Sequence, residues 1–339
     1  MVRIKILEAW AILRVLNFKR IANAFKTILN YYLTQITKYA IIKHQPLALS
    51  IEPTSICNLK CPECPTGTNT LLRPRGKISL VEYKKIIDQL PKELIYLNLY
   101  IQGEPTMHPD FPELIQLANN KNLYTSTSTN GHFITPALGK KIVESGLTRI
   151  IFSVDGTTQE SYEKYRIGGS LHKVIEGIKN ITSAKKKLKK RYPLVIIQFL
   201  VFKHNQHQLE EIKKIAKDLS VDKLEFKTAQ FNNYSDSPVE PPTIERFRRY
   251  ENTHRLRIKG KMLNKCWRQW HSAVITWNGK VAPCCYDKDA IYLLGDITTN
   301  NFSEIWKSKE SQLFKTNILQ NKKNISMCHN CPEGRSFWS

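Results

Sequence analysis

Three cysteines lie within eight residues of one another, where Cys57, Cys61 and Cys64 form a Cys-x3-Cys-x2-Cys motif. Thiolates are soft ligands that suit iron–sulfur clusters, zinc and copper(I). A closed zinc site and a fully ligated iron–sulfur cube each use four ligands, so three cysteines leave one position open. An open iron can bind and activate a small molecule. The alternative is a zinc site that takes a distant fourth ligand.

The other five cysteines lie toward the C-terminus, at positions 266, 284, 285, 328 and 331. Residues 274–277, the Asn278-Gly279 turn and residues 280–282 predict a β-hairpin, which would bring Cys266 and Cys284 together. A terminal Cys-x2-Cys supplies two more thiolates, and four thiolates close a cluster. A structural zinc ribbon is the alternative. Eight cysteines are too few for a disulfide scaffold in a chain of 339 residues, so their grouping indicates metal binding in a reducing cytosol.

The chain from residue 47 to 230 alternates between strand and helix patterns. Helices are expected at 83–90 after a Ser79 capping box, at 114–118, from Thr135-Pro136 to Gly146, from Ser170 through 178, and at 209–219. Repeated βα units predict a parallel sheet with right-handed crossovers. Six strands are expected, at Leu47–Ile51, Ile95–Ile101, Tyr124–Thr129, Arg149–Val154, Leu194–Phe202 and Leu224–Thr228.

Polar residues and one glycine follow several of these strands. In barrel architectures the reactive groups sit at the C-terminal ends of the strands. Ordinary turns are the alternative for most of them, and a surface ion pair with Glu163 is the alternative for the arginine. Residues of this kind are Gln102, Gly103, Glu104, Asn130, Ser153 and Asp155, and Arg166 lies farther along the chain after the fourth strand.

The cysteine motif directly follows a strand-like run at 47–52, and this combination resembles the cluster loop of the radical S-adenosylmethionine (SAM) superfamily. The resemblance implies that Cys57, Cys61 and Cys64 hold a [4Fe–4S] cluster whose open iron binds SAM. One electron then cleaves the sulfonium, and the 5′-deoxyadenosyl radical takes hydrogen from a substrate. Glu63 replaces an aromatic residue that the family often has. The implied fold is α/β, a partial (β/α)6 TIM-like barrel that covers about residues 47–230.

The same resemblance implies roles for the candidate residues. The stretch from Gln102 to Pro105 resembles the family's Gly-Gly-Glu motif, in which the carboxylate, here Glu104, holds the amino group of SAM. Gln102 stands in place of the first glycine. Asn130 lies in the turn near the cofactor. Ser153, with Asp155 as a helper, is expected to meet the ribose hydroxyls, and Arg166 to contact the carboxylate of SAM. No residue is identified as a general base.

The C-terminal pattern resembles the SPASM domain of radical peptide maturases. The match includes a Gly-x4-Cys turn at Gly279 and a helix containing Ile305 and Trp306 before the last cysteine pair. It implies one auxiliary [4Fe–4S] cluster, because full SPASM domains carry more cysteines and two such clusters. The spacing favours Cys284 over its neighbour, so the implied ligands are Cys266, Cys284, Cys328 and Cys331. By analogy, the substrate would be a peptide or small protein.

Residues 1–46 form a basic amphipathic helical prefix. Large apolar residues recur at helical spacing at positions 21, 25, 28, 32 and 36. Such a helix can lie on an anionic membrane surface or pack on the main domain or a partner. The number of apolar positions favours packing. No apolar run approaches the roughly 20 residues that span a bilayer, and no signal peptide with a cleavage site is evident.

The formal net charge is +23, which attracts nucleic acid, anionic lipid or an acidic substrate; the alternative is a set of solvated lysine faces. Four segments are expected: the prefix at 1–46, the barrel at 47–230, a linker at 231–265 and the cysteine-rich domain at 266–339. The favoured function is a cytoplasmic radical SAM enzyme served by flavodoxin or ferredoxin, with peripheral contact to the inner face of the membrane as an option. The alternatives are a non-catalytic zinc protein that contacts nucleic acid, and a radical SAM enzyme acting on RNA or a lipid-linked substrate.

Overall fold

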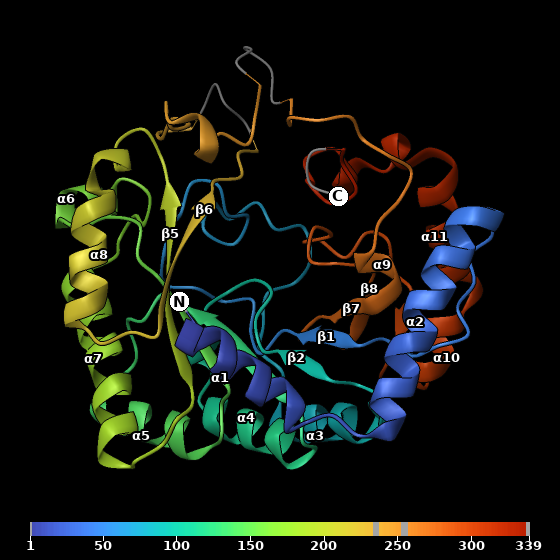
Figure 1. The fold of residues 1–339 in the computed structure, drawn as a ribbon, viewed down its shortest axis with the longest axis horizontal. Helices are drawn as coiled ribbons and strands as arrows, with labels where there is room; N and C mark the ends of the chain where they lie inside the picture. The colour runs from blue at the N-terminus through green and yellow to red at the C-terminus, as the bar shows by residue number, and fades with distance from the viewer. Residues whose placement is uncertain (1, 233–236, 252–256, 337–339) are drawn as a thin grey trace.

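A computed structural model describes residues 2–232, 237–251 and 257–336 (Figure 1). The strands are β1 (Ala48–Ile51), β2 (Tyr96–Asn98), β3 (Tyr124–Thr129), β4 (Arg149–Ser153), β5 (Leu194–Val201), β6 (Lys223–Thr228), β7 (Ser272–Ile275), β8 (Lys280–Ala282) and β9 (Gly295–Asp296). They form one sheet in the order β6-β5-β4-β3-β2-β1-β7-β8-β9. In the described residues β6 and β9 are the outer strands, so the sheet stays open, as a partial barrel.

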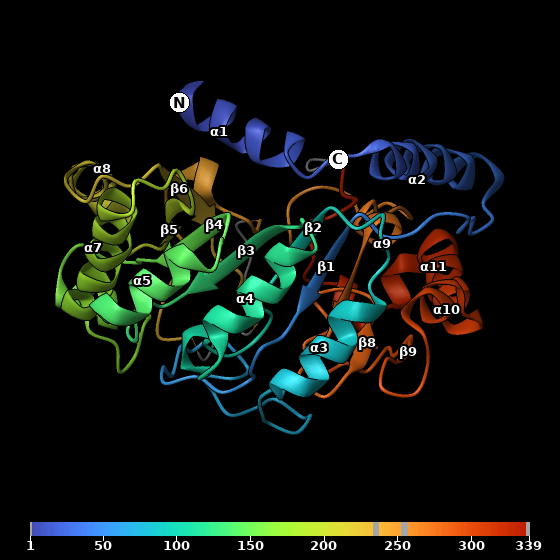
Figure 2. The ribbon, with the colours of Figure 1, turned by 90° about the horizontal axis from the view of Figure 1, so that it is seen from below.

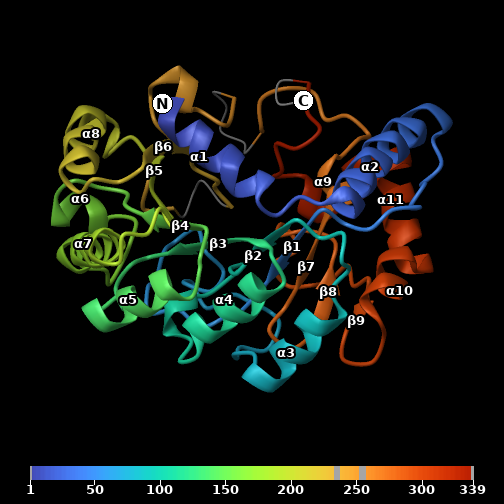
Figure 3. The same ribbon diagram turned by 60° about the horizontal axis from the view of Figure 1, so that its bottom comes forward.

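Strands β1 to β6 are mutually parallel, as the βα pattern predicts. Each of the six expected strands is present, with boundaries that differ by no more than a few residues. The helices are α1 (Val2–Leu13), α2 (Phe18–Thr37), α3 (Leu80–Gln89), α4 (Phe111–Asn120), α5 (Pro136–Glu144), α6 (Gln159–Glu163), α7 (Leu171–Lys187), α8 (Leu209–Asp218), α9 (Arg268–His271), α10 (Phe302–Lys307) and α11 (Lys309–Asn321). Figure 3 shows α3, α4, α5, α7 and α8 along the outer side of the sheet.

The barrel helices begin where local capping chemistry predicts. The Ser79 hydroxyl accepts a hydrogen bond from the backbone of Glu82, and the Glu82 carboxylate accepts from the backbone of Ser79, which completes the capping box of α3. The hydroxyls of Thr135 and Ser170 accept from the backbone of Leu138 and Lys173 and cap α5 and α7, without the reciprocal bond. Each cap satisfies backbone N–H groups that have no partner inside the helix.

The C-terminal segment extends the barrel sheet. Strands β7 and β8 form the predicted antiparallel hairpin, and Gly279 takes the positive φ that its turn requires. Strand β7 also pairs in parallel with β1, with Leu49 opposite Ala273, which the sequence did not predict. One apolar core runs from the barrel into this segment, where it includes Phe302, Trp306 and Phe314. The proposed boundaries of the barrel, linker and cysteine-rich domain stay predictions, and 233–236 and 252–256 of the linker lie outside the described residues.

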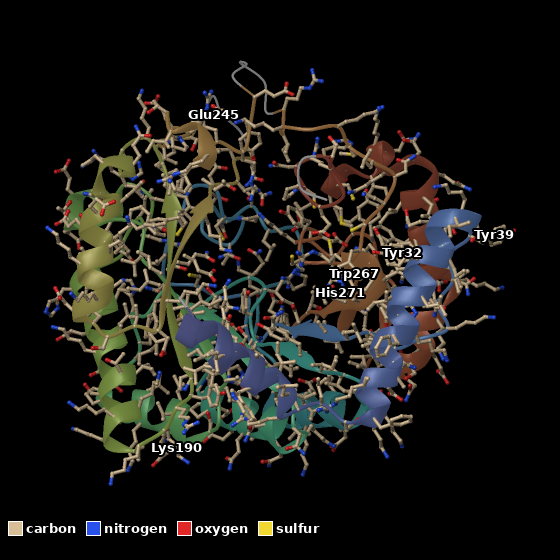
Figure 4. The ribbon with its side chains drawn as sticks, in the orientation of Figure 1. Tyr32, Tyr39, Lys190, Glu245, Trp267 and His271 are labelled. Carbon is tan, nitrogen blue, oxygen red and sulfur yellow. The ribbon has the colours of Figure 1, made fainter. Side chains whose placement is uncertain are left out.

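The prefix forms two helices, because the side chain of Asn17 caps a new helix at α2. The prefix does pack on the main domain through α2, but it uses polar residues: Ile21, Phe25, Ile28, Tyr32 and Ile36 are all exposed, and Arg20 bonds the barrel backbone. Figure 4 shows Trp267 and His271 next to α2; their rings stack at 5.0 Å. In the part of the chain that the structure describes, no helix combines the length and the apolar character needed to cross a bilayer.

Candidate active site

A cavity of about 240 Å³ lies at the C-terminal ends of β1 to β4. The motif cysteines line it together with five of the seven predicted cofactor residues, which come from loops and strand ends far apart in sequence. These lining residues are Cys57, Cys61, Cys64, Gly103, Glu104, Asn130, Ser153 and Arg166. The predicted residues Gln102 and Asp155 lie behind this lining and contact residues that belong to it.

Each motif cysteine contacts a predicted cofactor residue from a different part of the barrel. These three contacts connect the cysteine loop to the ends of β2 and β3 and to the segment after α6. They are Asn130 Nδ2 to Cys57 Sγ at 3.8 Å, Arg166 Nη1 to Cys61 Sγ at 3.7 Å, and Cys64 Sγ to Gln102 Oε1 at 3.6 Å. The barrel therefore positions all three sulfur atoms around one cavity.

The chemistry of these thiols fits an iron–sulfur cluster. Burial raises the pKa of Cys57 to about 12, and burial also raises the pKa of Cys61, against the effect of Arg166. Without a metal both groups stay protonated, and iron would supply the charge that deprotonates them. In the described residues no group of three or more His, Cys, Asp or Glu side chains could hold a metal ion. A [4Fe–4S] cube does not need ligands that converge on one metal ion, because each of its cysteines binds a separate iron atom.

The carboxylate of Glu104 is completely buried and accepts four hydrogen bonds from the ends of β2 and β3. The donors are Thr106 N at 3.0 Å, Thr106 Oγ1 at 2.6 Å, Thr129 Oγ1 at 2.6 Å and Asn130 N at 2.6 Å. Burial raises the pKa of Glu104, and these donors oppose the shift. Three of the bonds go to Oε1, so Oε2 keeps room to accept another donor.

Arg166 pairs with Asp155 rather than with Glu163. Its Nε donates to Asp155 Oδ2 at 2.6 Å, and Asp155 Oδ1 accepts from the backbone of Leu200 at 2.7 Å. Burial acts to lower the pKa of Arg166, but Asp155 and Cys61 outweigh that effect and raise it well above its ordinary value. Asp155 therefore holds the guanidinium in the cavity wall, and the surface ion pair with Glu163 is not found.

Gly103 allows the turn after β2 to pass close to the cysteine loop. Its φ is +73°, and a Cβ there would lie 2.4 Å from the carbonyl oxygen of Thr54 and 2.8 Å from that of Ile56. The next residue, Glu104, donates its backbone N–H to Ile56 at 2.8 Å. A side chain at 103 would push the cysteine loop and Glu104 apart.

We expect Gly103→Ala to lower the free energy of unfolding by more than the roughly 1–3 kcal/mol typical of backbone strain alone, because a steric overlap adds to the strain. Gly168→Ala is the matched control, since Gly168 has a φ of +78° but no atom within 4 Å of the added Cβ. Urea unfolding of the anaerobically purified variants measures both losses. Equal losses in the two variants would refute the argument from close approach.

Several lining residues were missed from the sequence, namely Leu59, Tyr100, Ile101, Ser128 and Tyr165. Ser128 lies at the end of a predicted strand, so the rule that placed Asn130 could have included it. Leu59, Cys61, Tyr165 and Phe202 share one apolar cluster. This cluster surrounds Cys61 with apolar atoms, whereas Glu63, next to Cys64, accepts a hydrogen bond from the backbone of Asn232 at 2.6 Å.

The C-terminal cysteines form a second group. Cys266, Cys284, Cys328 and Cys331 are all buried, while Cys285 is half-buried. Burial is the main cause that raises the pKa of Cys266 to about 11 and that of Cys328 to about 12, and Cys331 contributes to both shifts. Burial also raises the pKa of Cys284, and Cys285, Cys266 and Cys331 add to that rise. These thiols are therefore close enough to influence one another, while their role as cluster ligands and the choice of Cys284 over Cys285 stay predictions.

A buried ion pair connects the two cysteine-bearing segments. Glu52, at the end of β1, accepts from Arg73 Nη1 at 2.7 Å and Nη2 at 2.5 Å. The same carboxylate accepts from the backbone of Gln102 and of Trp277, each at 3.2 Å, and Arg73 Nε donates to the carbonyl oxygen of Lys288 at 2.7 Å. The ion pair therefore joins the barrel, the loop after the cysteine motif and the C-terminal segment.

Comparison with known families and proteins agrees with this geometry. Residues 51–219 match the radical SAM superfamily, and residues 266–332 match SPASM, an iron–sulfur cluster-binding domain. The mycofactocin maturase MftC of Mycobacterium tuberculosis is 31% identical over 172 residues, which are 50% of this chain and 42% of that protein. The PqqA peptide cyclase of Bradyrhizobium diazoefficiens is 25% identical over 289 residues, 79% of this chain and 74% of that protein.

Solved structures resemble the fold at low sequence identity. Streptococcus suis SuiB bound to its precursor peptide SuiA has a TM-score of 0.62 at 15% identity, covering 88% of this chain and 74% of that chain. The matched segment spans less than half of the mycofactocin maturase, so that protein's activity does not transfer with the match.

These matches overturn the alternative of a non-catalytic zinc protein. The chain belongs to the radical SAM superfamily of enzymes, with SAM and a SAM-binding [4Fe–4S] cluster as cofactors, and its C-terminal part is a SPASM-type domain for auxiliary iron–sulfur chemistry.

Proposed function

We propose that this enzyme cleaves SAM reductively and uses the resulting radical to remove hydrogen from a peptide substrate. A [4Fe–4S] cluster held by Cys57, Cys61 and Cys64 would supply the one electron that cleaves the sulfonium of SAM into methionine and a 5′-deoxyadenosyl radical. That radical takes a hydrogen atom from the substrate and becomes 5′-deoxyadenosine. The electron comes from a reduced one-electron carrier protein of the flavodoxin or ferredoxin class.

The observation that carries this proposal is the convergence of the motif cysteines and the polar strand ends on one cavity. In the proposal, Cys57, Cys61 and Cys64 hold the cluster. The guanidinium of Arg166, oriented by Asp155, suits the planar carboxylate of SAM. Ser153 and Asn130 lie in the same cavity wall, where they can meet the ribose and the amino acid part of the cofactor.

The free acceptor position on Glu104 supports its assignment to the amino group of SAM. The carboxylate cannot turn away, because four donors hold it. It therefore offers Oε2 to an ammonium group without a cost in side-chain ordering. The second cluster, on Cys266, Cys284, Cys328 and Cys331, would accept or relay an electron.

The peptide substrate is supported by the relatives. Two of them are named as a maturase and a peptide cyclase, and one structure of similar fold holds a precursor peptide. These names describe those proteins, and for this chain they favour a peptide over a small metabolite.

The test uses anaerobically reconstituted enzyme, SAM, dithionite and short peptides encoded beside the gene, prepared with deuterated side chains. We expect a productive peptide to increase 5′-deoxyadenosine formation and to transfer deuterium into it, because hydrogen abstraction moves that atom to the cofactor. Mass spectrometry measures the label. Cleavage of SAM that no peptide stimulates or labels would contradict the peptide assignment, and absence of any cleavage would contradict the enzyme function itself.

A further inference from the structure

Helix α2 is turned with its polar side toward the protein. Its buried residues are Arg20, Asn23, Thr27, Asn30 and Thr34, which recur every three or four positions. Burying polar groups is unfavourable unless each finds a hydrogen-bond partner. An inward polar face therefore has to be built with specific contacts, which can be checked one by one.

The buried polar groups of α2 do have specific partners. Arg20 donates to the backbone carbonyl oxygens of Lys92 and Lys121, at 3.3 and 3.1 Å. Asn23 exchanges two hydrogen bonds with the backbone of Gln45, at 2.9 and 3.0 Å. The amide of Asn30 lies 2.9 Å from the buried ring nitrogen Nδ1 of His44. These contacts fix the rotation of the helix, so its outward face is set by the fold.

The outward face of α2 is apolar along its length. Phe25 is 68% exposed and Ile36 is 77% exposed, and five further large side chains share this face at helical spacing: Ile21, Ile28, Leu29, Tyr32 and Leu33. Figure 4 places Tyr39, just beyond the end of α2, at the outer edge of the molecule. Contiguous exposed apolar surface of this kind marks an interaction site.

Helix α1 adds to the same surface. Ile6, Trp10 and Leu13 are exposed at helical spacing, and Trp10 is 60% exposed. Figure 2 shows α1 and α2 on the same side of the molecule, opposite α3 and α4. Both helices leave apolar residues exposed on this side, so one extended partner can contact both.

The charges around this surface are positive. The exposed basic residues of the prefix are Lys5, Arg14, Lys19, Lys26, Lys38 and Lys43. Glu8 is the only acidic residue among residues 1–46, and it pairs with Arg149 at 3.7 Å. No uncompensated negative charge is left on the described part of the prefix.

We propose that α1 and α2 dock on an anionic lipid surface, with their apolar side chains in the interface and their lysines at the phosphate level. Interfacial helices combine an apolar face with Lys and Arg, and Trp and Tyr favour the membrane–water boundary. A second copy of the chain fits this surface less well, because it would bring a further set of cations against the first. The net charge of +23 extends the attraction to anionic lipid over the whole protein.

The experiment is co-flotation of the purified holoenzyme with vesicles, either phosphatidylcholine alone or phosphatidylcholine with phosphatidylglycerol. We expect flotation with the anionic vesicles only, with at least a tenfold weaker affinity at 0.5 M salt. The double variant Phe25→Ser with Ile36→Ser should lose at least tenfold in affinity. Val81→Ser is the matched control, because Val81 is a 65% exposed apolar residue on α3, outside the prefix, and it should float as the wild type does.

Iron content and SAM cleavage of the double variant should match the wild type, which separates a lipid-binding defect from misfolding. Protein that stays in solution with the anionic vesicles would overturn the proposal. Sedimentation showing a dimer that only the double variant disrupts, without flotation, would assign the surface to a second copy and overturn it too. Flotation is read without substrate or electron donor, so its outcome does not depend on the proposed function.

Discussion

The Cys61→Ala variant should form no 5′-deoxyadenosine and should bind about four irons per chain, against about eight in the wild type with two cubes. Cys61 is buried in the wall of the cavity, and its sulfur contacts Arg166. With only two thiolates left in the motif, the cube that binds SAM loses one of its three protein ligands. Iron analysis and chromatography of the reaction products after anaerobic reconstitution measure both effects.

Two other cysteine variants complete the design. Cys331→Ala removes a predicted ligand of the second cluster, so it should also lose about four irons, while SAM still binds at the first. Cys285→Ala should keep about eight irons, because Cys285 is the half-buried thiol that was not chosen as a ligand. Formation of 5′-deoxyadenosine by Cys61→Ala would refute the assignment of the motif.

The Arg73→Met variant should lose about 3–5 kcal/mol of stability, which is the usual cost of leaving a buried charge without its partner. The Glu52 side chain has no exposed surface, and that of Arg73 is 8% exposed. The free energy of unfolding of a domain is commonly about 5–15 kcal/mol, so this single change removes a large part of the stability. Urea unfolding of the holoenzyme measures the loss.

A double variant distinguishes the effect of an unpaired buried charge on stability from the effect of lost side-chain packing. Glu52→Gln together with Arg73→Met removes both charges, so it should be more stable than Arg73→Met alone. Arg75→Met is the matched control: Arg75 is exposed, its guanidinium donates to the backbone of Thr66, and the loss should stay below about 1 kcal/mol. A double variant as unstable as the sum of the two single variants would show that the ion pair is not the cause.

Local chemistry made much of the barrel predictable. Caps such as Ser79 and Thr135 act within four residues, so the sequence alone places the helix starts. The parallel strand order then brings the residues after each strand to one edge, which is why Glu104, Asn130 and Ser153 meet the cysteine loop. Spacing within one motif, such as that of Cys57 to Cys64, carries the same kind of short-range information.

The unpredicted features depend on contacts between distant segments. The pairing of β7 with β1 joins residues more than 200 positions apart, and the sequence of neither short strand indicates which strand it pairs with. The amphipathic period of α2 defines two faces but not which one is buried, because that choice depends on acceptors such as the backbone of Lys121. Likewise, Asp155 supports Arg166 from behind the cavity, and a motif does not distinguish a lining residue from its support.

The parallel pairing of β7 with β1 also sets where the C-terminal segment lies relative to the strand that precedes the first cysteine motif. The first cysteine motif follows β1 directly, and Cys284 and Cys285 follow the β7–β8 hairpin closely. If each cysteine group holds a cluster, the register between Leu49 and Ala273 would therefore set the spacing of the two metal centres. A shift of β7 along β1 would change that spacing even if every cysteine kept its place in the sequence.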